Sequence, residues 1–133
     1  MQVKDSIALV TGANRGLGRA WASALLEAGA RKVYAAARDP ASVDIAGVIP
    51  IRLDITNPAH IAAAATECAD VTLLVNNAGI ARGGELLAGD GADVLREELE
   101  TNLFGTLAMC RAFAPRLGAN GGGGIVNVLS VLS

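Results

Sequence analysis

The chain has 133 residues, which suits one domain, and its 52% hydrophobic and 18% charged residues allow a substantial core and exclude a disordered chain. The net charge is −2 with no basic run, which argues against a nucleic acid or an anionic membrane as partner. Asp5 comes too early for a secretion signal, and no apolar run is long enough to cross a bilayer, so we expect a cytoplasmic protein.

The first half of the chain alternates between short apolar runs and helical patterns. Ser6–Val10 ends in Thr11-Gly12 and predicts a buried strand. A helical stripe follows, and Gly29 is placed to end that helix. The stripe consists of Leu17, Ala20, Trp21, Ala24, Leu25 and Ala28. Lys32–Ala37 predicts the second strand, which Arg38-Asp39-Pro40 breaks before a short, weak helix.

Three more elements follow before the middle of the chain. Val48–Leu53 predicts a third strand, and Pro50 places it at an edge because proline cannot donate to a ladder. Thr56-Asn57-Pro58 combines a capping side chain with a proline in the first turn, and predicts a helix that runs to Cys68. Val71–Val75 predicts the fourth strand.

The rest of the chain predicts one long helix and one strand. A glycine-bearing loop covers Asn76 to about Gly91, Gly118–Gly124 is a turn, and Ile125–Leu129 predicts the fifth strand. The long helix between them carries an inward stripe of Leu95, Leu99, Asn102, Thr106, Met109 and Phe113.

This alternation predicts an α/β fold of the Rossmann type, a doubly wound parallel sheet in the order 3-2-1-4-5. In that order the winding reverses between the first and fourth strands, and ligands bind there, beyond the carboxyl ends of the strands. The loops Gly12–Gly18 and Asn76–Gly79 follow these two strands, so we expect them to form one site.

The loop from Thr11 to Gly18 carries glycines in G-x-x-x-G-x-G spacing between a strand and a helix. Glycine lets a phosphate approach the backbone, and the amides and dipole of the helix start attract an anion. Leu17 and Gly18 are expected to let the helix lie close on the sheet. A glycine-rich turn without a ligand is the alternative, which the strand–loop–helix context disfavours.

This spacing resembles the Thr-Gly-x-x-x-Gly-x-Gly of the short-chain dehydrogenase/reductases, and the resemblance extends over nearly the whole chain. Four further matches occur in the family's order: Asp54, the acid that contacts adenine; Asn76-Asn77-Ala78-Gly79; the active-site Asn102; and Ile125-Val126-Asn127-Val128-Leu129-Ser130, a strand ending in the catalytic serine. The resemblance implies hydride transfer between a nicotinamide and a carbonyl or alcohol carbon.

The resemblance also assigns roles to residues of this chain. The cofactor would be held by Gly12, Asn14, Arg15, Gly16, Leu17, Gly18, Arg38, Asp54, Asn76, Ala78 and Gly79. Asn102 would support a kink and a proton-relaying water, unless it only bonds a neighbouring backbone group. Ser130 would hold the substrate carbonyl, unless it is a turn residue. It suits this role better than Ser133 because it directly follows the strand.

The charges near the second strand predict NADP(H) rather than NAD. A site for NAD usually has an acid at the end of that strand, where this chain has Ala37 followed by Arg38. Arg38 and Arg15 would suit a 2′-phosphate, because arginine binds phosphate bidentately. Asp39 is interpreted as a solvated turn residue.

The family's Tyr-x-x-x-Lys pair falls about a dozen residues beyond the serine, and the chain ends before that point. The single tyrosine heads Tyr34-Ala-Ala-Ala-Arg38, where arginine replaces lysine, and we expect it to be a packing residue. Residues 1–133 are therefore expected to be an incomplete dinucleotide-binding domain that stops before a sixth strand and is inactive by itself.

Two alternatives remain: a fragment that binds dinucleotide without catalysis, and an interaction protein that has lost nucleotide affinity. The resemblance implies a homo-oligomer, dimer or tetramer, for the whole protein. Cys68, Cys110 and His60 lack a zinc-ligand spacing, so we expect two buried thiols, a surface histidine and no metal site.

Overall fold

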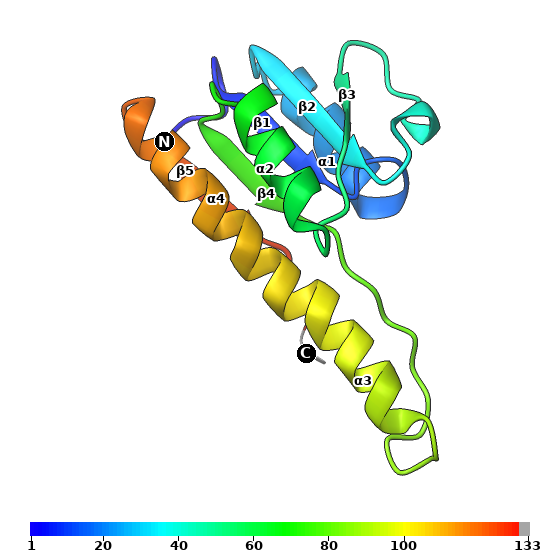
Figure 1. Cartoon of the computed structure of the whole chain (residues 1–133). Coiled ribbons are helices and arrows are strands. Elements are labelled where there is room, and N and C mark those ends of the chain that lie inside the picture. Colours follow the sequence, from blue (N-terminus) through cyan, green and yellow to red (C-terminus); the bar gives the residue numbers. More distant parts are fainter. Residues whose placement is uncertain (131–133) are drawn as a thin grey trace.

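The computed structural model describes residues 1–130, so Ser133 lies outside the described part of the chain. Its five strands form one parallel sheet in the order β3-β2-β1-β4-β5, which confirms the predicted fold class (Figure 1). The strands are β1 (Ile7–Thr11), β2 (Lys32–Ala37), β3 (Ile49–Arg52), β4 (Leu73–Asn76) and β5 (Gly124–Asn127).

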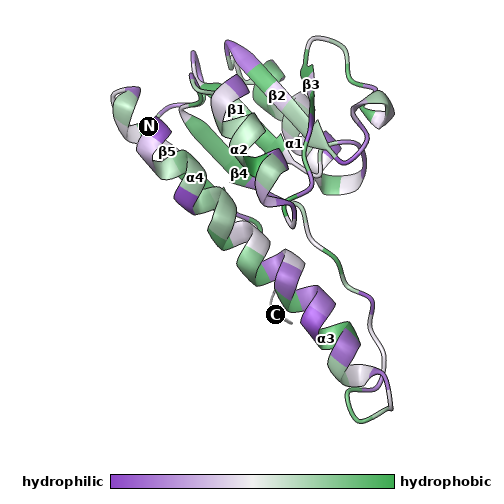
Figure 2. Cartoon of the chain, in the orientation of Figure 1, coloured by the Kyte–Doolittle hydropathy of each residue, from purple (hydrophilic) through white to green (hydrophobic). Residues whose placement is uncertain are grey.

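Helices cover both faces of this sheet. They are α1 (Gly16–Glu27), the short η1 (Pro40–Ser42), α2 (Pro58–Glu67), α3 (Gly91–Leu99), the π-helical η2 (Glu100–Gly105) and α4 (Thr106–Ala119). Helix α1 packs on one face, and α2 and α4 pack together on the other. α3, η2 and α4 form one continuous rod, whose α3 end projects away from the sheet and is largely hydrophilic (Figures 1 and 2).

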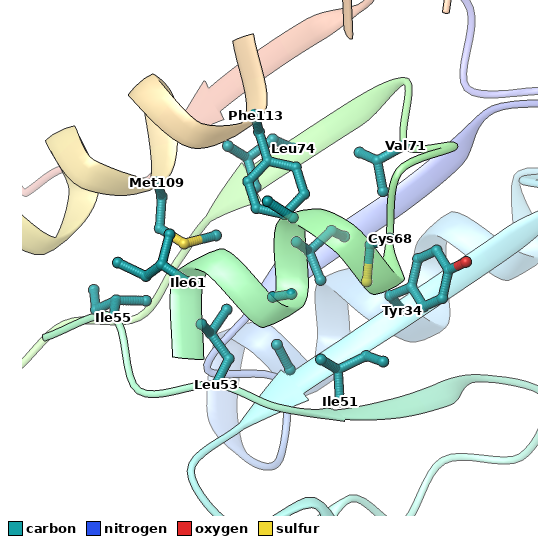
Figure 3. Packing of buried hydrophobic residues seen from close by; sticks show 14 of the residues in the cluster. Tyr34, Ile51, Leu53, Ile55, Ile61, Cys68, Val71, Leu74, Met109 and Phe113 are labelled. Carbon is teal, nitrogen blue, oxygen red and sulfur yellow. The ribbon is translucent and has the colours of Figure 1, made fainter. Parts of the chain in front are cut away.

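The larger core lies between the sheet and the α2–α4 layer. Phe113 and Met109 of α4 meet Ile61 of α2 above Leu74 and Ile51 of the sheet (Figure 3). All five side chains are at most 6% exposed, so this layer accounts for much of the apolar area removed from water. The α1 side is lined mainly by alanine and valine, which lets that helix approach closely.

Three local predictions are confirmed. Gly29 has a φ of +88° after α1, and the amides of Gly29 and Ala30 donate to carbonyls of the last turn of that helix. Asn57 caps α2 by accepting from the amide of Ala59 at 3.0 Å. Pro50 lies in the edge strand β3.

The predicted stripe of α1 is largely wrong. Its buried residues are Gly18, Ala22 and Leu25, whereas Leu17 is 57% exposed and Trp21 is 37% exposed. The close approach of Gly18 to the preceding loop sets the rotation of the helix, so Leu17 does not help the helix to lie on the sheet.

The stripe of the long helix is correct only in its second half. Met109 and Phe113 are fully buried, but Leu95 and Leu99 are each 41% exposed because α3 has passed beyond the edge of the sheet. Two smaller expectations also change. Cys110 is partly exposed rather than buried, and His60 is half-buried rather than a surface residue.

Candidate functional site

A cleft of about 750 Å³ lies at the carboxyl ends of β1, β2, β3 and β4, where the winding of the sheet reverses. It collects nearly all the side chains that the sequence assigned to a cofactor, although they are spread over almost seventy positions of the chain. Ten of the eleven line it: Gly12, Asn14, Arg15, Gly16, Leu17, Gly18, Arg38, Asp54, Ala78 and Gly79.

The three glycines of the Thr11–Gly18 loop have different structural roles. Gly12 and Gly16 have φ values of +65° and +52°, which L side chains adopt only at a cost. A β-carbon on Gly16 would meet nothing within 4 Å, so it would project into open space. A β-carbon on Gly18 would collide with the carbonyl oxygen of Gly12, so this glycine permits close packing of helix on loop.

Helix α1 begins at the cleft with no side chain capping its first turn, and that turn contains no acidic residue. Helix α2 differs, since Asn57 accepts from the amides of both Ala59 and His60. Uncapped amides at a helix start carry a partial positive charge and are satisfied by water or by an anion. The arrangement is suited to a phosphate group at the start of α1.

Thr11 and Asn77 lock the two loops of the cleft together. The buried Thr11 hydroxyl accepts from the amides of Asn77 and Ala78, at 3.0 and 2.9 Å. In return, the Asn77 side-chain amide donates to the carbonyl oxygens of Thr11 and Gly12, at 3.0 and 3.3 Å. Asn77 lines the cleft and was not singled out from the sequence, although it stands in the quoted Asn-Asn-Ala-Gly.

Asn76 faces away from the cleft. Its side chain is 5% exposed, and its Nδ2 donates to Oδ1 of Asn127 on β5 at 2.8 Å. Asn76 is the last residue of β4 and contacts Cys110 of α4, whereas Asn77, the first residue after the strand, lines the cleft.

Arg15 and Arg38 both line the cleft and are both exposed. The Asp39 carboxylate caps η1 by accepting from the amide of Ala41 at 3.0 Å, so it is a turn residue. The wall of the cleft beyond the end of β2 therefore contains the two guanidinium groups and the carboxylate of Asp39, which is already bonded to the amide of Ala41.

Asp54 lies at the end of β3 with its carboxylate held in place. The amide and the hydroxyl of Thr56 donate to its Oδ1, at 2.9 and 2.7 Å. These two bonds, assisted by the charges of Arg38 and His60, lower the pKa of Asp54 against the opposing effect of burial. The amide of Asp54 also donates to Nδ1 of the half-buried His60 at 3.2 Å.

Asn102 lies within the π-helical η2 and does not line the cleft. Its side-chain amide bonds both backbone groups of Ile80, accepting from the nitrogen at 2.8 Å and donating to the oxygen at 2.7 Å. Asn102 therefore bonds a neighbouring backbone group, as the alternative interpretation of the sequence expected, and it does so where η2 interrupts the regular α-helix. The bond fixes the chain just after Gly79.

Ser130 follows β5 by three residues, is exposed, and does not line the cleft. Tyr34 is buried on β2, where its hydroxyl bonds Asp70 at 2.9 Å and Lys32 at 3.3 Å. Burial, followed by the Asp70 bond, raises the pKa of Tyr34, which opposes any role as an acid–base group. The sequence did not indicate the other side of the cleft, formed by Ile80, Arg82, Glu97, Glu100 and Thr101.

Comparison with known proteins places this geometry in a family. Residues 6–133 match the sequence profile described as short chain dehydrogenase. The chain belongs to the short-chain dehydrogenase family. A short-chain dehydrogenase from Burkholderia cenocepacia, crystallised with NADP, is 48% identical, with a TM-score of 0.94 over 99% of this chain and 56% of that one.

Two further relatives are similar over a comparable length. A galactitol 2-dehydrogenase from Cereibacter sphaeroides is 37% identical over 98% of this chain and 54% of its own. A 3-ketoacyl-(acyl-carrier-protein) reductase from Brucella melitensis, complexed with NADH, is 29% identical, with a TM-score of 0.85 over 97% of this chain and 59% of its own. The chain thus spans just over half the length of these short-chain dehydrogenases.

Neither a membrane-spanning helix nor a cluster of metal ligands is found in the described part of the chain. Residues 1–130 contain no helix that is both long and apolar enough to cross a membrane. Within the same residues, no three His, Cys, Asp or Glu side chains gather as a metal site would require.

Proposed function

We propose that residues 1–133 belong to the dinucleotide-binding domain of an NADP(H)-dependent oxidoreductase that interconverts a carbonyl and an alcohol. The observation that carries this proposal is the uncapped start of α1 behind the open Gly16 bend, with Arg15 and Arg38 beside it. Such a seat is side-chain-free and electropositive, as a pyrophosphate requires.

The residues of the cleft would divide the dinucleotide among them. The amides at the start of α1 would bind the pyrophosphate, and the two guanidinium groups would bind the 2′-phosphate. Asp54, whose carboxylate is held ionised and oriented by Thr56, would accept from the adenine. The Asn77–Gly79 loop, which Thr11 pins in place, would contact the ribose side. The bound nicotinamide supplies or accepts the hydride.

The catalytic roles are proposals of the same kind. Ser130 would donate its hydroxyl hydrogen to the oxygen of a small carbonyl or alcohol substrate and so orient it. Asn102, bonded to Ile80, would act through the shape of the π-helical segment and the loop beyond Gly79. We further propose that the whole protein is a cytoplasmic homo-oligomer.

NADP(H) is preferred over NAD(H) because β2 ends at Ala37 and is followed by Arg38 rather than by an acid, and because the Asp39 carboxylate is engaged by the amide of Ala41. NADP accompanies the Burkholderia cenocepacia relative, whereas NADH accompanies the Brucella melitensis reductase, so the family alone does not decide. The two guanidinium groups favour the phosphorylated cofactor.

Titration of the protein with NADPH and with NADH tests this proposal. We expect Arg15→Ala and Arg38→Ala each to weaken NADPH binding by roughly 10-fold or more, as loss of a charged hydrogen bond implies, and NADH binding by less than about threefold. Arg19→Ala is the matched control, because Arg19 is an exposed arginine of α1, one turn after Arg15, that does not line the cleft. Equal losses for both nucleotides would contradict the assignment of the 2′-phosphate.

A second candidate function is dinucleotide binding without turnover. It is favoured by the state of Tyr34, the one tyrosine of the sequence, which is tied to Asp70 and Lys32 away from the cleft. NADPH oxidation by the 133-residue chain with a carbonyl substrate would exclude this candidate. A third, a protein without nucleotide affinity, requires that millimolar NADPH leave the thermal unfolding temperature unchanged.

A further inference from the structure

The last rung of the β4–β5 ladder is a pair of asparagines. Asn76 and Asn127 are partners in register, and Asn76 Nδ2 donates to Asn127 Oδ1 at 2.8 Å. Cys110 of α4 completes the group, with its Sγ 3.4 Å from Asn76 Nδ2 and 4.0 Å from Asn127 Oδ1. We call these three side chains the amide bridge.

Packing alone does not explain an amide at position 76. The side chain is 5% exposed, yet its Oδ1 has no hydrogen-bond partner in the described structure. A buried acceptor without a donor costs free energy, and an apolar residue would avoid that cost. The amide therefore contributes something that an apolar residue cannot, namely a directed bond to β5.

Strand β5 packs against α4 and is bonded to β4, but several of its apolar side chains stay exposed within residues 1–130. Ile125 and Val126 are 37% and 40% exposed, and Leu129 is 80% exposed. Among residues 1–130 the strand pairs with β4 alone. At the end of β5 the amide bridge therefore adds a directed side-chain bond to the backbone ladder and to the packing on α4.

The bridge also stands where the two halves of the site separate. One residue after Asn76 the chain enters the Asn77–Gly79 loop, which Thr11 holds against the glycine loop. Three residues after Asn127 it reaches Ser130. Val128 adds a backbone bond to the carbonyl oxygen of Asn76, at 2.9 Å. A displacement of Asn127 relative to Asn76 would therefore shift Ser130 relative to the cofactor loop.

We propose that Asn76 and Asn127 are positioning residues, and that their side-chain bond, packed against Cys110, sets the location of Ser130 relative to the cofactor cleft. This inference rests on the proposed function, because it matters only if Ser130 holds the substrate.

The test uses Asn127, which is the more exposed of the two asparagines. Asn127→Leu removes the acceptor, whereas Asn127→Asp keeps an oxygen to accept from Asn76 Nδ2. The matched control is Val126→Thr, a similar-sized change on the same strand outside the bridge. In the whole protein we would measure kcat and KM for reduction of nitrobenzaldehyde, the dissociation constant of NADPH, and hydrogen exchange of residues 128–130.

We expect Asn127→Leu to lower kcat on the order of 10- to 100-fold, as misplacement of a catalytic group does, and to change NADPH binding less than about twofold. Exchange at residues 128–130 should become faster. Asn127→Asp should keep kcat within about threefold of the parent, and Val126→Thr should match the parent. Unchanged kcat and exchange in Asn127→Leu would overturn the positioning role, as would equal losses in Asn127→Leu and Asn127→Asp.

Ser130→Ala separates this inference from the function beneath it. If Ser130→Ala removes activity while Asn127→Leu does not, only the positioning role fails. If Ser130→Ala leaves kcat unchanged, or if the parent protein does not reduce the aldehyde, the proposed function fails and the inference fails with it.

Discussion

The Cα of Gly18 lies so close to the carbonyl oxygen of Gly12 that a β-carbon on Gly18 would fall within 3.0 Å of that oxygen. We expect Gly18→Ala to destabilise the fold by about 2 kcal/mol, because backbone must move to relieve the overlap. The same shift should weaken NADPH binding, since the start of α1 would tilt away from the loop. Urea unfolding and nucleotide titration measure the two effects.

Two other glycines separate the effect of the steric overlap at Gly18 from the general effect of replacing a glycine by alanine. Gly16→Ala meets no atom but imposes a left-handed conformation, so we expect a loss of about 1 kcal/mol and weaker NADPH binding. Gly118→Ala, in α4 with open space around it, should raise stability by about 0.5–1 kcal/mol. A Gly18→Ala protein as stable as the parent would show that the contact with Gly12 does not constrain the helix.

Replacement of Thr11 by valine tests the connection between the two loops. Thr11 is 1% exposed, and valine keeps the shape of its side chain. The variant leaves the amides of Asn77 and Ala78 without their acceptor. We expect a loss of about 2 kcal/mol in the free energy of unfolding, because two partly buried donors lose their acceptor. NADPH binding should weaken as the Asn77–Gly79 loop loosens.

Thr66→Val is the matched control, because the Thr66 hydroxyl donates only to the Ala62 carbonyl on the exposed side of α2. Its effect should stay within about 0.5 kcal/mol. If the two threonine variants unfold at the same urea concentration, the Thr11 hydroxyl does not hold the loops together.

The features predicted correctly from the sequence are those that local chemistry decides. Gly29 ends α1 because only glycine adopts its φ cheaply, and Asn57 begins α2 because its side chain reaches the next amides. Pro50 lies in the edge strand because proline has no amide hydrogen to donate to a further strand. The loops after β1 and β4 were predicted to meet because the strand order brings the carboxyl ends of these two strands together, whereas residues such as Asp54 were singled out from the resemblance to the family.

The errors occur where a neighbouring element decides. Leu17 fits an apolar stripe, but the approach of Gly18 to Gly12 rotates it toward solvent. Leu95 also fits an apolar stripe, but α3 lies beyond the edge of the sheet, so Leu95 has no sheet to pack against and stays 41% exposed. Asn76 and Asn77 are chemically identical, and their contacts decide which of them faces the cleft: Asn76, the last residue of β4, bonds Asn127, whereas Asn77, just after the strand, bonds Thr11.

The bonds from Thr56 to Asp54 predict a pH effect. Because they lower the pKa of Asp54 in the folded state, they stabilise the fold above the unfolded pKa, and this contribution is lost as pH falls through the folded pKa. Thr56→Val should move the pKa of Asp54 back up. Thr56 is exposed, so we expect the loss of stability to stay below about 1 kcal/mol near neutral pH, and to vanish in acid.

An NMR titration of the Asp54 carboxyl carbon, beside urea unfolding at neutral and acid pH, measures both quantities. Thr66→Val again serves as the control, since it should leave the Asp54 titration unaltered. A Thr56→Val protein in which Asp54 titrates as in the parent would show that the hydroxyl bond does not hold the carboxylate.

The two cysteines should differ in reactivity by a large factor. Cys68 is fully buried, and burial raises the pKa of its thiol to about 12, so the reactive thiolate is scarce near neutral pH. Cys110 is partly exposed between α4 and β5. Iodoacetamide should therefore add one group to the native protein, at Cys110, and a second only in denaturant. Mass spectrometry of a Cys110→Ala variant is the stricter test, since that protein should remain unmodified until it unfolds. Labelling of Cys68 under native conditions would mean that the core around Val71 and Tyr34 opens far more readily than its packing implies.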